Sequence, residues 1–252
     1  MASEDSSKLE KEISGMVGLW GGGTPISVQG FESCARDRQS AGAMHCDMWK
    51  IEEICIEPYI KDAVVVDIGT NGGGWLLRMA KEAKECHGID IQTAEHTGFW
   101  KYMPEKYHDK TKYHQVTDFS CSGIEDGSLD FVFSHDVFCH ISFSGAVAYL
   151  ESLYSKCKPG ANLMIAIADA DKYKSEQGRN QLMKRAGFNN WEDFVGDYDG
   201  EPPENHGRWY FYGPDMFSEE AERIGFEVVS KDAIGDHDRT LAMVHFRKPA
   251  GR

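Results

Sequence analysis

Carboxylate and histidine side chains recur directly after short apolar runs of this chain. Asp90 and Asp118 each follow such a run, and so does the segment Ser134-His135-Asp136. One carboxylate can accept hydrogen bonds from both hydroxyls of a ribose, and another can accept one from an exocyclic amine such as that of adenine. The two aspartates therefore predict an adenosine site. A neutral histidine can accept a proton near pH 7, so His135 is a candidate base.

A glycine-rich loop precedes these residues in the chain. Positions 67–74 read Asp-Ile-Gly-Thr-Asn-Gly-Gly-Gly and come at the end of the β-branched run Ala63–Ile68. Glycine lets the backbone adopt positive φ and pass close to a bound ligand. An ordinary strand-to-helix turn uses glycine too, so the loop alone does not select a ligand. Asp90 lies roughly 20 residues after Asp67, the spacing of a ribose-binding acid, which supports the adenosine interpretation.

Alternating apolar runs and amphipathic segments are expected to hold this site. The apolar runs predict strands at Ala63–Ile68, Cys86–Ile91, Lys112–Val116, Leu129–Ser134 and Leu163–Ala168. Helices are predicted at Trp75–Lys84 and Gly145–Lys158, the second ending in a Lys158-Pro159-Gly160 turn. Strands that alternate with helices indicate βαβ units and a parallel sheet. A last helix at Pro214–Ile224 and two closing strands at Phe226–Ser230 and Thr240–Phe246 complete the prediction.

The rest of the chain is expected to surround this core. Residues 1–43 are interpreted as a mobile tail (1–12) and an irregular arm (13–43). Residues 44–252 are expected to form one domain, which begins with a short amphipathic helix at 44–61. Residues from about 170 to 213 break the rhythm of strands and helices, so we expect them to form a small cap over the carboxyl edge of the sheet.

Residues 63–168 resemble the core of the class I S-adenosylmethionine-dependent methyltransferases. The first motif of that family is an acid followed by glycines at alternate positions, and it matches Asp67, Gly69, Asn71 and Gly73. Asn71 replaces the middle glycine, and asparagine tolerates the left-handed conformation better than most residues. The resemblance implies S-adenosylmethionine as the cofactor. It also implies a Rossmann-like α/β fold with helices on both faces of a mostly parallel seven-stranded sheet, whose last strand is antiparallel.

The same resemblance assigns further residues to the cofactor. Asp90 would bind the ribose, Ile91 would cover one face of the adenine, and Gln92 would lie near the ribose. The pair Asp118-Phe119 would meet the adenine amine and a ring nitrogen. Backbone carbonyls of Ser134 and His135 would meet the amino group of the cofactor.

The sulfonium group makes the cofactor's methyl group electrophilic, so the protein must hold a nucleophile about 3 Å from it. A hydroxyl nucleophile must also lose a proton, and His135, Asp136 and His206 are the candidate catalytic residues. His140 is expected only to pack below the loop. Arg208, Trp209 and Tyr212 would line a substrate pocket, although these aromatic rings could equally form a plug that fastens the cap to the core.

The leading hypothesis is O-methylation of a small molecule, most simply a sugar or polyol, with histidine as general base. An N-methyltransferase for an amine is the alternative, since a deprotonated amine needs less from the histidines. An NAD(P)-dependent oxidoreductase is a further alternative, but the loop lacks the middle glycine of that fingerprint. A non-catalytic binding module that kept the fold is another.

Bulk properties limit the partners and the location. A formal net charge of -14 argues against a nucleic-acid substrate. No apolar run reaches the roughly 20 residues that cross a bilayer, and the start of the chain lacks the apolar core of a signal peptide, so we expect a cytoplasmic protein with no membrane contact. The seven cysteines are scattered, which indicates free thiols and no zinc site. Asp136, Asp169, Asp171, His135 and His206 could converge on a metal, but no spacing demands it, so no metal is expected. A homo-oligomer remains open.

Overall fold

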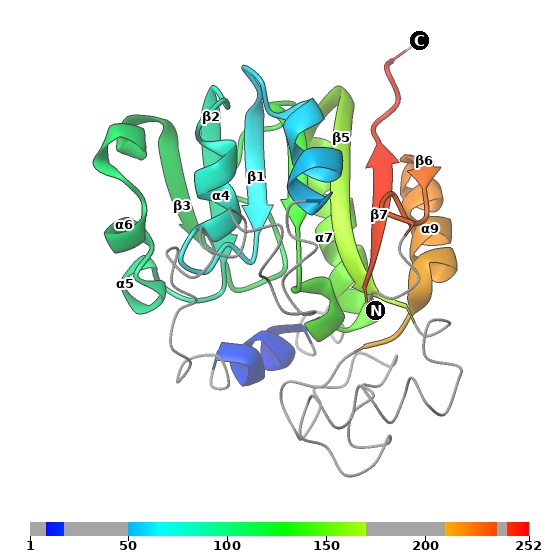
Figure 1. Ribbon diagram of the computed structural model, residues 1–252. Coiled ribbons are helices and arrows are strands. Elements are labelled where there is room, and N and C mark those ends of the chain that lie inside the picture. The colour runs from blue at the N-terminus through cyan, green and yellow to red at the C-terminus, as the bar shows by residue number, and fades with distance from the viewer. Residues whose placement is uncertain (1–8, 18–49, 170–209, 236–240, 252) are drawn as a thin grey trace, which may run out of the picture.

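A seven-stranded sheet forms the centre of the molecule in the computed structural model, which describes residues 9–17, 50–169, 210–235 and 241–251. The strand order is β3-β2-β1-β4-β5-β7-β6 (Figure 1). The first five strands pair in parallel, and β7 is antiparallel to both of its neighbours. This confirms the predicted fold. The strands are β1 (Val64–Ile68), β2 (Glu85–Asp90), β3 (Thr111–Gln115), β4 (Leu129–Ser134), β5 (Cys157–Ala168), β6 (Glu227–Ser230) and β7 (Leu241–Arg247).

Helices cover both faces of the sheet. Every residue of β1 is buried, as a continuous β-branched run requires when a strand is covered on both sides. Val64 and Val66 pack with residues of α7 (Phe143–Lys156) and α9 (Gly213–Ile224) on one face. Val65 packs on the other face with residues of α4 (Gly74–Met79), α6 (Phe99–Tyr102) and the turns at residues 51–59. The short helix α5 (Ala94–Thr97) follows β2.

One predicted boundary was wrong, and one predicted helix is irregular. The Lys158-Pro159-Gly160 turn lies inside β5, where the pairing register with β4 shifts and Gly160 has φ 86°. A bulge therefore absorbs the residues that predicted a turn. The expected helix at 44–61 is, in its described part, a π-helical turn at Ile51–Ile56 followed by a 3-10 turn at Glu57–Tyr59. Pro58 lacks a backbone N–H, so a regular helix cannot continue through it.

The expectation of a mobile tail and irregular arm fails for residues 9–17, which are helical. Ile13 is buried in the core of the sheet face that α7 covers. Glu12 is buried beside it, where its carboxylate accepts hydrogen bonds from the backbone N–H (2.7 Å) and the hydroxyl (2.6 Å) of Ser142. Ser142 is also the N-cap of α7 and accepts a hydrogen bond from the Gly145 amide. These contacts hold the N-terminal helix against the end of α7.

A histidine pair on β2 and β3 makes the stability of the fold depend on pH. His87 Nδ1 lies 2.9 Å from His114 Nε2, and their rings are stacked. Burial, with the neighbouring His114, lowers the pKa of His87 from 6.5 to about 4. Protonation is therefore easier in the unfolded chain, so the stability that this pair contributes is complete above about pH 6.5 and is lost as the pH falls toward 4.

Replacing His87 with glutamine is expected to remove the part of this dependence that His87 contributes. Between pH 7.5 and pH 5 the free energy of unfolding of the wild type should fall by about 2 kcal/mol more than that of H87Q. Urea unfolding at the two pH values measures this difference. Parallel pH dependence of the two proteins would contradict the assignment.

Candidate cofactor-binding and catalytic site

The carboxyl ends of β1, β2 and β3 meet at one edge of the sheet. The backbone amides of Gly69 and Thr70, at the start of the glycine loop, donate to the Ile89 carbonyl on β2 at 2.8 and 3.0 Å. The Asn71 amide donates to Asp90 Oδ2 at 2.8 Å. On the other side of β2, the Val116 amide donates to the Asp90 carbonyl at 2.9 Å. The structure therefore brings together the loop, Asp90 and the segment leading to Asp118.

The loop has the backbone geometry that its sequence predicts. Gly69, Asn71 and Gly73 all have positive φ, at 72°, 48° and 81°. Asn71 adopts the left-handed conformation for which the family uses a glycine, so the loop tolerates this substitution. A Cβ atom at Gly69 would lie 2.2 Å from Cγ2 of Val137, so the loop packs directly against the segment that follows β4.

Asp90 is the acid best suited to a ribose. Its Oδ2 accepts a hydrogen bond from the backbone amide of Asn71, and its Oδ1 accepts one from the backbone amide of Gln92 at 2.9 Å. A carboxylate has about four acceptor positions, so acceptor capacity remains for a ribose hydroxyl. Burial raises the pKa of Asp90, and the backbone amides oppose that shift by stabilising the charged form. These carboxylate acceptors are compatible with the two hydroxyl donors of a ribose.

The other predicted cofactor residues occupy different depths around this edge. Asp67 is buried beneath the loop, and burial raises its pKa to about 7. Asp118 is exposed and accepts a hydrogen bond from the Ser120 hydroxyl at 2.6 Å. Phe119 is buried with φ 49°, its ring edge-on to Tyr149. Ile91 is half-buried.

Gln92 connects the cofactor edge to the N-terminal helix. Its backbone N–H binds Asp90, and its side-chain amide donates to the Val17 carbonyl at 3.0 Å. The sequence reading placed Gln92 near the ribose but did not include residues 9–17 in the site. The available signal was the helical spacing of Leu9, Ile13, Met16 and Val17, which lie in or against the core. The contacts with Gln92 and Ser142 then fix where this helix lies.

The segment after β4 carries the candidate catalytic side chains. The hydroxyl of Ser134 is buried and donates to the Ile68 carbonyl at 3.0 Å, which ties β4 to the end of β1. His135 is half-buried, with its ring edge-on to that of Trp75 at a centroid distance of 5.6 Å. Asp136 is exposed and has φ 60°. The carboxylate of Asp136 is therefore accessible from solvent, whereas the Ser134 hydroxyl holds the end of β4 against β1.

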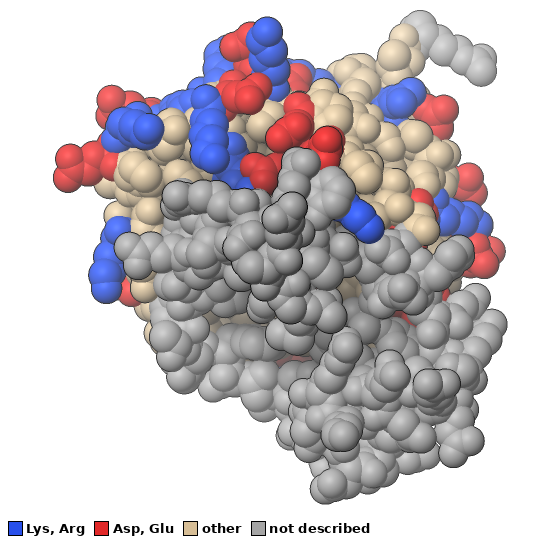
Figure 2. Space-filling view, viewed as in Figure 1, with Lys and Arg blue, Asp and Glu red and all other residues tan. Residues whose placement is uncertain are grey.

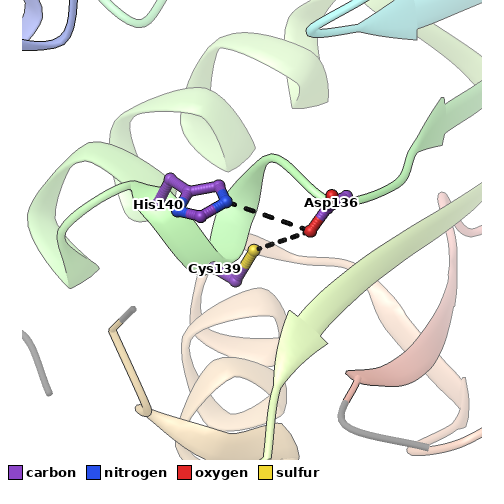
Figure 3. Close-up of side chains that lie close together, drawn as sticks. All are labelled: Asp136, Cys139 and His140. Carbon is purple, nitrogen blue, oxygen red and sulfur yellow. Dashed lines mark hydrogen bonds and ion pairs between the residues drawn. The ribbon is translucent and has the colours of Figure 1, made fainter. Parts of the chain in front are cut away.

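Asp136 contacts two side chains that the sequence reading did not place in the site. His140 Nε2 lies 3.9 Å from Asp136 Oδ1, and Cys139 Sγ lies 3.5 Å from the same oxygen (Figure 3). Cys139 is fully buried, and burial raises the pKa of its thiol well above the usual range. The i, i+4 spacing of Asp136 and His140 was the available signal. The sequence predicts only a packing role for His140, but its ring also faces the carboxylate of Asp136.

The predicted substrate wall is only partly described. His206, Arg208, Trp209 and most of the expected cap lie outside the described residues, as does Asp171. Tyr212 is buried, and its hydroxyl donates to the Phe138 carbonyl at 2.7 Å. Its ring packs against Phe143 and Phe217. These contacts fit the alternative in which the aromatic rings fasten the cap to the core. They also hold the segment that carries Asp136 and His140.

The described surface carries charges of both signs. Figure 2 shows acidic and basic side chains interspersed on the described part of one face. Among the described residues, none of the helices combines the length and the apolar character that crossing a membrane requires.

A mostly parallel seven-stranded sheet with an antiparallel β7, a glycine loop after β1 and an acid at the end of β2 define an S-adenosylmethionine-dependent methyltransferase. Comparison with known proteins agrees. The chain belongs to the family whose model is described as a methyltransferase domain, which matches residues 52–231. The enzyme therefore uses S-adenosylmethionine as its cofactor.

Solved structures share the fold at low sequence identity. An S-adenosylmethionine-dependent methyltransferase from Mesorhizobium loti superposes with a TM-score of 0.56 and 11% identity, covering 80% of this chain and 97% of that one. One from Aquifex aeolicus gives a TM-score of 0.51 and 16% identity, covering 88% and 99%.

A curated relative shares part of the sequence. Phosphoethanolamine N-methyltransferase 2 of Caenorhabditis elegans is 29% identical over 118 residues, which are 44% of this chain. The match spans 26% of that protein's length, about a quarter of it.

Proposed function

We propose that the enzyme methylates a small-molecule acceptor, and that the segment after β4 removes the acceptor's proton. The observation that carries this proposal is the contact of Asp136 with His140, 3.9 Å apart, on the segment whose Val137 packs against the glycine loop. A carboxylate beside an imidazole attracts the positive charge that the ring acquires when it accepts a proton. His135, one residue before Asp136, is the second candidate for the same task.

The cofactor supplies an electrophilic methyl group when it is bound. The chain's own residues do the remaining work. Asp90 and the glycine loop orient the nucleoside, and the exposed carboxylate of Asp136 holds the acceptor by a hydrogen bond or a charge. His135 or His140 takes the proton from the nucleophile.

A hydroxyl acceptor, as in a sugar or polyol, is our first candidate. A hydroxyl stays protonated near pH 7, so its methylation depends on a proton acceptor held in place, and this site has two histidines available. Cofactor residues implied by the family resemblance (Asp67, Gly69, Asn71, Gly73, Asp90, Ile91, Gln92, Asp118, Phe119, Ser134, His135) are kept in this proposal, as is His206 as a further base. So are the cytoplasmic location and the absence of a nucleic-acid substrate.

An amine acceptor is the second candidate, and the phosphoethanolamine N-methyltransferase relative favours it. The strongly acidic chain also supports it, because a net charge of -14 attracts an ammonium group. Asp136 would then pair with the ammonium before its proton is removed.

A paired acceptor screen tests the two candidates. The enzyme is supplied with S-adenosylmethionine and either a panel of sugars and polyols or a panel of amino alcohols that includes phosphoethanolamine. Release of S-adenosylhomocysteine and the mass of the methylated product are measured. A methylated hydroxyl supports the first candidate, and a methylated nitrogen supports the second. Turnover with macromolecular acceptors alone would overturn both.

A further inference from the structure

Three side chains of different chemistry converge at the end of β4. Asp136 contributes a carboxylate, Cys139 a thiol and His140 an imidazole, and one ligand atom from each lies within 4.8 Å of the other two. Figure 3 shows the Cys139 sulfur and the His140 nitrogen both directed at the same oxygen of Asp136. The chain positions them by one short turn, the 3-10 turn at Phe138–His140, which Val137 separates from the positive-φ residue Asp136.

The spacing of these atoms is close to that of a tetrahedral zinc site. With Zn–S about 2.3 Å and Zn–N and Zn–O about 2.0–2.2 Å, tetrahedral angles separate the ligand atoms by about 3.3–3.6 Å. The sulfur lies 3.5 Å from the carboxylate oxygen, and the imidazole nitrogen lies 3.9 Å from it. The third pair, the sulfur and an imidazole nitrogen, lies within 4.8 Å. A side-chain shift of up to about one ångström therefore brings all three ligand atoms to tetrahedral spacing.

The ligand chemistry selects the metal. Thiolate and imidazole ligands favour zinc and its neighbours, whereas magnesium and calcium prefer oxygen alone. Cys139 is buried, the His140 side chain is 11% exposed, and the Asp136 side chain is 56% exposed. A cation therefore has a route in from the Asp136 side and a sheltered position between the other two ligands.

We propose that Asp136, Cys139 and His140 form a binding site for a thiophilic divalent cation, zinc in the first place. Binding forms bonds from the metal to the sulfur, the His140 nitrogen and an Asp136 oxygen, and the thiol proton is released to solvent. Three protein ligands leave one coordination position for water. The occupied site also blocks the His140 nitrogen, so zinc inhibits methyl transfer. That inhibition rests on the proposed role of His140, whereas the binding itself does not.

Cobalt substitution tests the binding without any acceptor. The metal-free full-length protein is titrated with Co²⁺, and the near-ultraviolet band that a thiolate-to-cobalt bond produces is recorded. One equivalent should give the band, and zinc should displace it. In Cys139→Ser the band should disappear and the affinity for Co²⁺ should fall by at least about tenfold. Cys157→Ser is the matched control, because Cys157 is also a buried free cysteine but pairs with Leu129 at the opposite end of β4.

Activity then tests the inhibition. The ratio of the rate in zinc to the rate in a chelator should be well below one for the wild type and for C157S, and should approach one for C139S. A cobalt band that persists in C139S, or no band in the wild type, would overturn the site. A normal band with no effect of zinc on turnover would instead overturn the role of His140. Circular dichroism confirms that each variant is folded, and His140→Gln provides a second variant that should lose affinity for Co²⁺.

Discussion

Replacing His140 with alanine is expected to lower kcat by about 100- to 10,000-fold, with little change in the affinity for S-adenosylhomocysteine. The imidazole faces Asp136 rather than the glycine loop or Asp90, so its loss removes proton transfer and leaves the cofactor contacts in place. Steady-state kinetics on the acceptor found in the screen, with calorimetry for the cofactor product, separates these two effects.

Parallel variants decide which histidine takes the proton. H135A should lower kcat less than H140A if His140 is the acceptor, and more if His135 is. His108→Ala is the matched control, because His108 is also half-buried and contacts a backbone carbonyl, that of Met103, away from β4. Equal and small effects of H135A and H140A would contradict the proposed base and would favour an acceptor that needs none.

Gly69→Ala is expected to destabilise the protein by several kcal/mol and to abolish measurable cofactor binding. An alanine Cβ at this position would lie 2.2 Å from Val137, and the residue has φ 72°, which an L side chain adopts at a cost of about 1–2 kcal/mol. The loop must therefore move away from the segment after β4. Its amides then lose their positions beside Asp90.

Gly127→Ala separates the clash from the backbone strain. Gly127 has φ 65°, but a Cβ there meets nothing within 4 Å, so G127A should cost only the strain of about 1–2 kcal/mol and leave cofactor binding intact. The double variant G69A/V137A removes both Val137 methyl groups and should recover part of the stability that G69A loses. Thermal unfolding and calorimetry measure the set. If G69A and G127A behave alike, the loop does not pack as described.

The sequence predicts the fold and the meeting of the glycine loop with Asp90 well, because both depend on local patterns. The β-branched run at 63–68 requires a strand buried on both faces, and it forms β1. Parallel pairing then places the ends of β1 and β2 side by side, so Asp90 meets the loop without any further information. The left-handed conformation of Asn71 could be predicted too, because the loop alone sets it.

The remaining features depend on contacts that are distant in the chain or on single backbone angles. The helix at residues 9–17 is placed by the buried pair of Glu12 with Ser142, 130 positions apart, which no local pattern encodes. The contact of Asp136 with His140 arises because a positive φ at Asp136 is followed, after Val137, by a 3-10 turn. The extension of β5 depends on a bulge that only its pairing with β4 defines.

Calorimetric titration with S-adenosylhomocysteine tests the central claim, that one nucleoside is bound where the glycine loop meets Asp90. The wild type should bind one equivalent, and Asp90→Ala should bind more weakly by about 1–3 kcal/mol, which is roughly 5- to 150-fold, because the ribose loses its acceptors. Asp126→Ala serves as the control, since this exposed carboxylate pairs with Lys156 away from the loop. An affinity of D90A equal to that of the wild type and of D126A would contradict the claim.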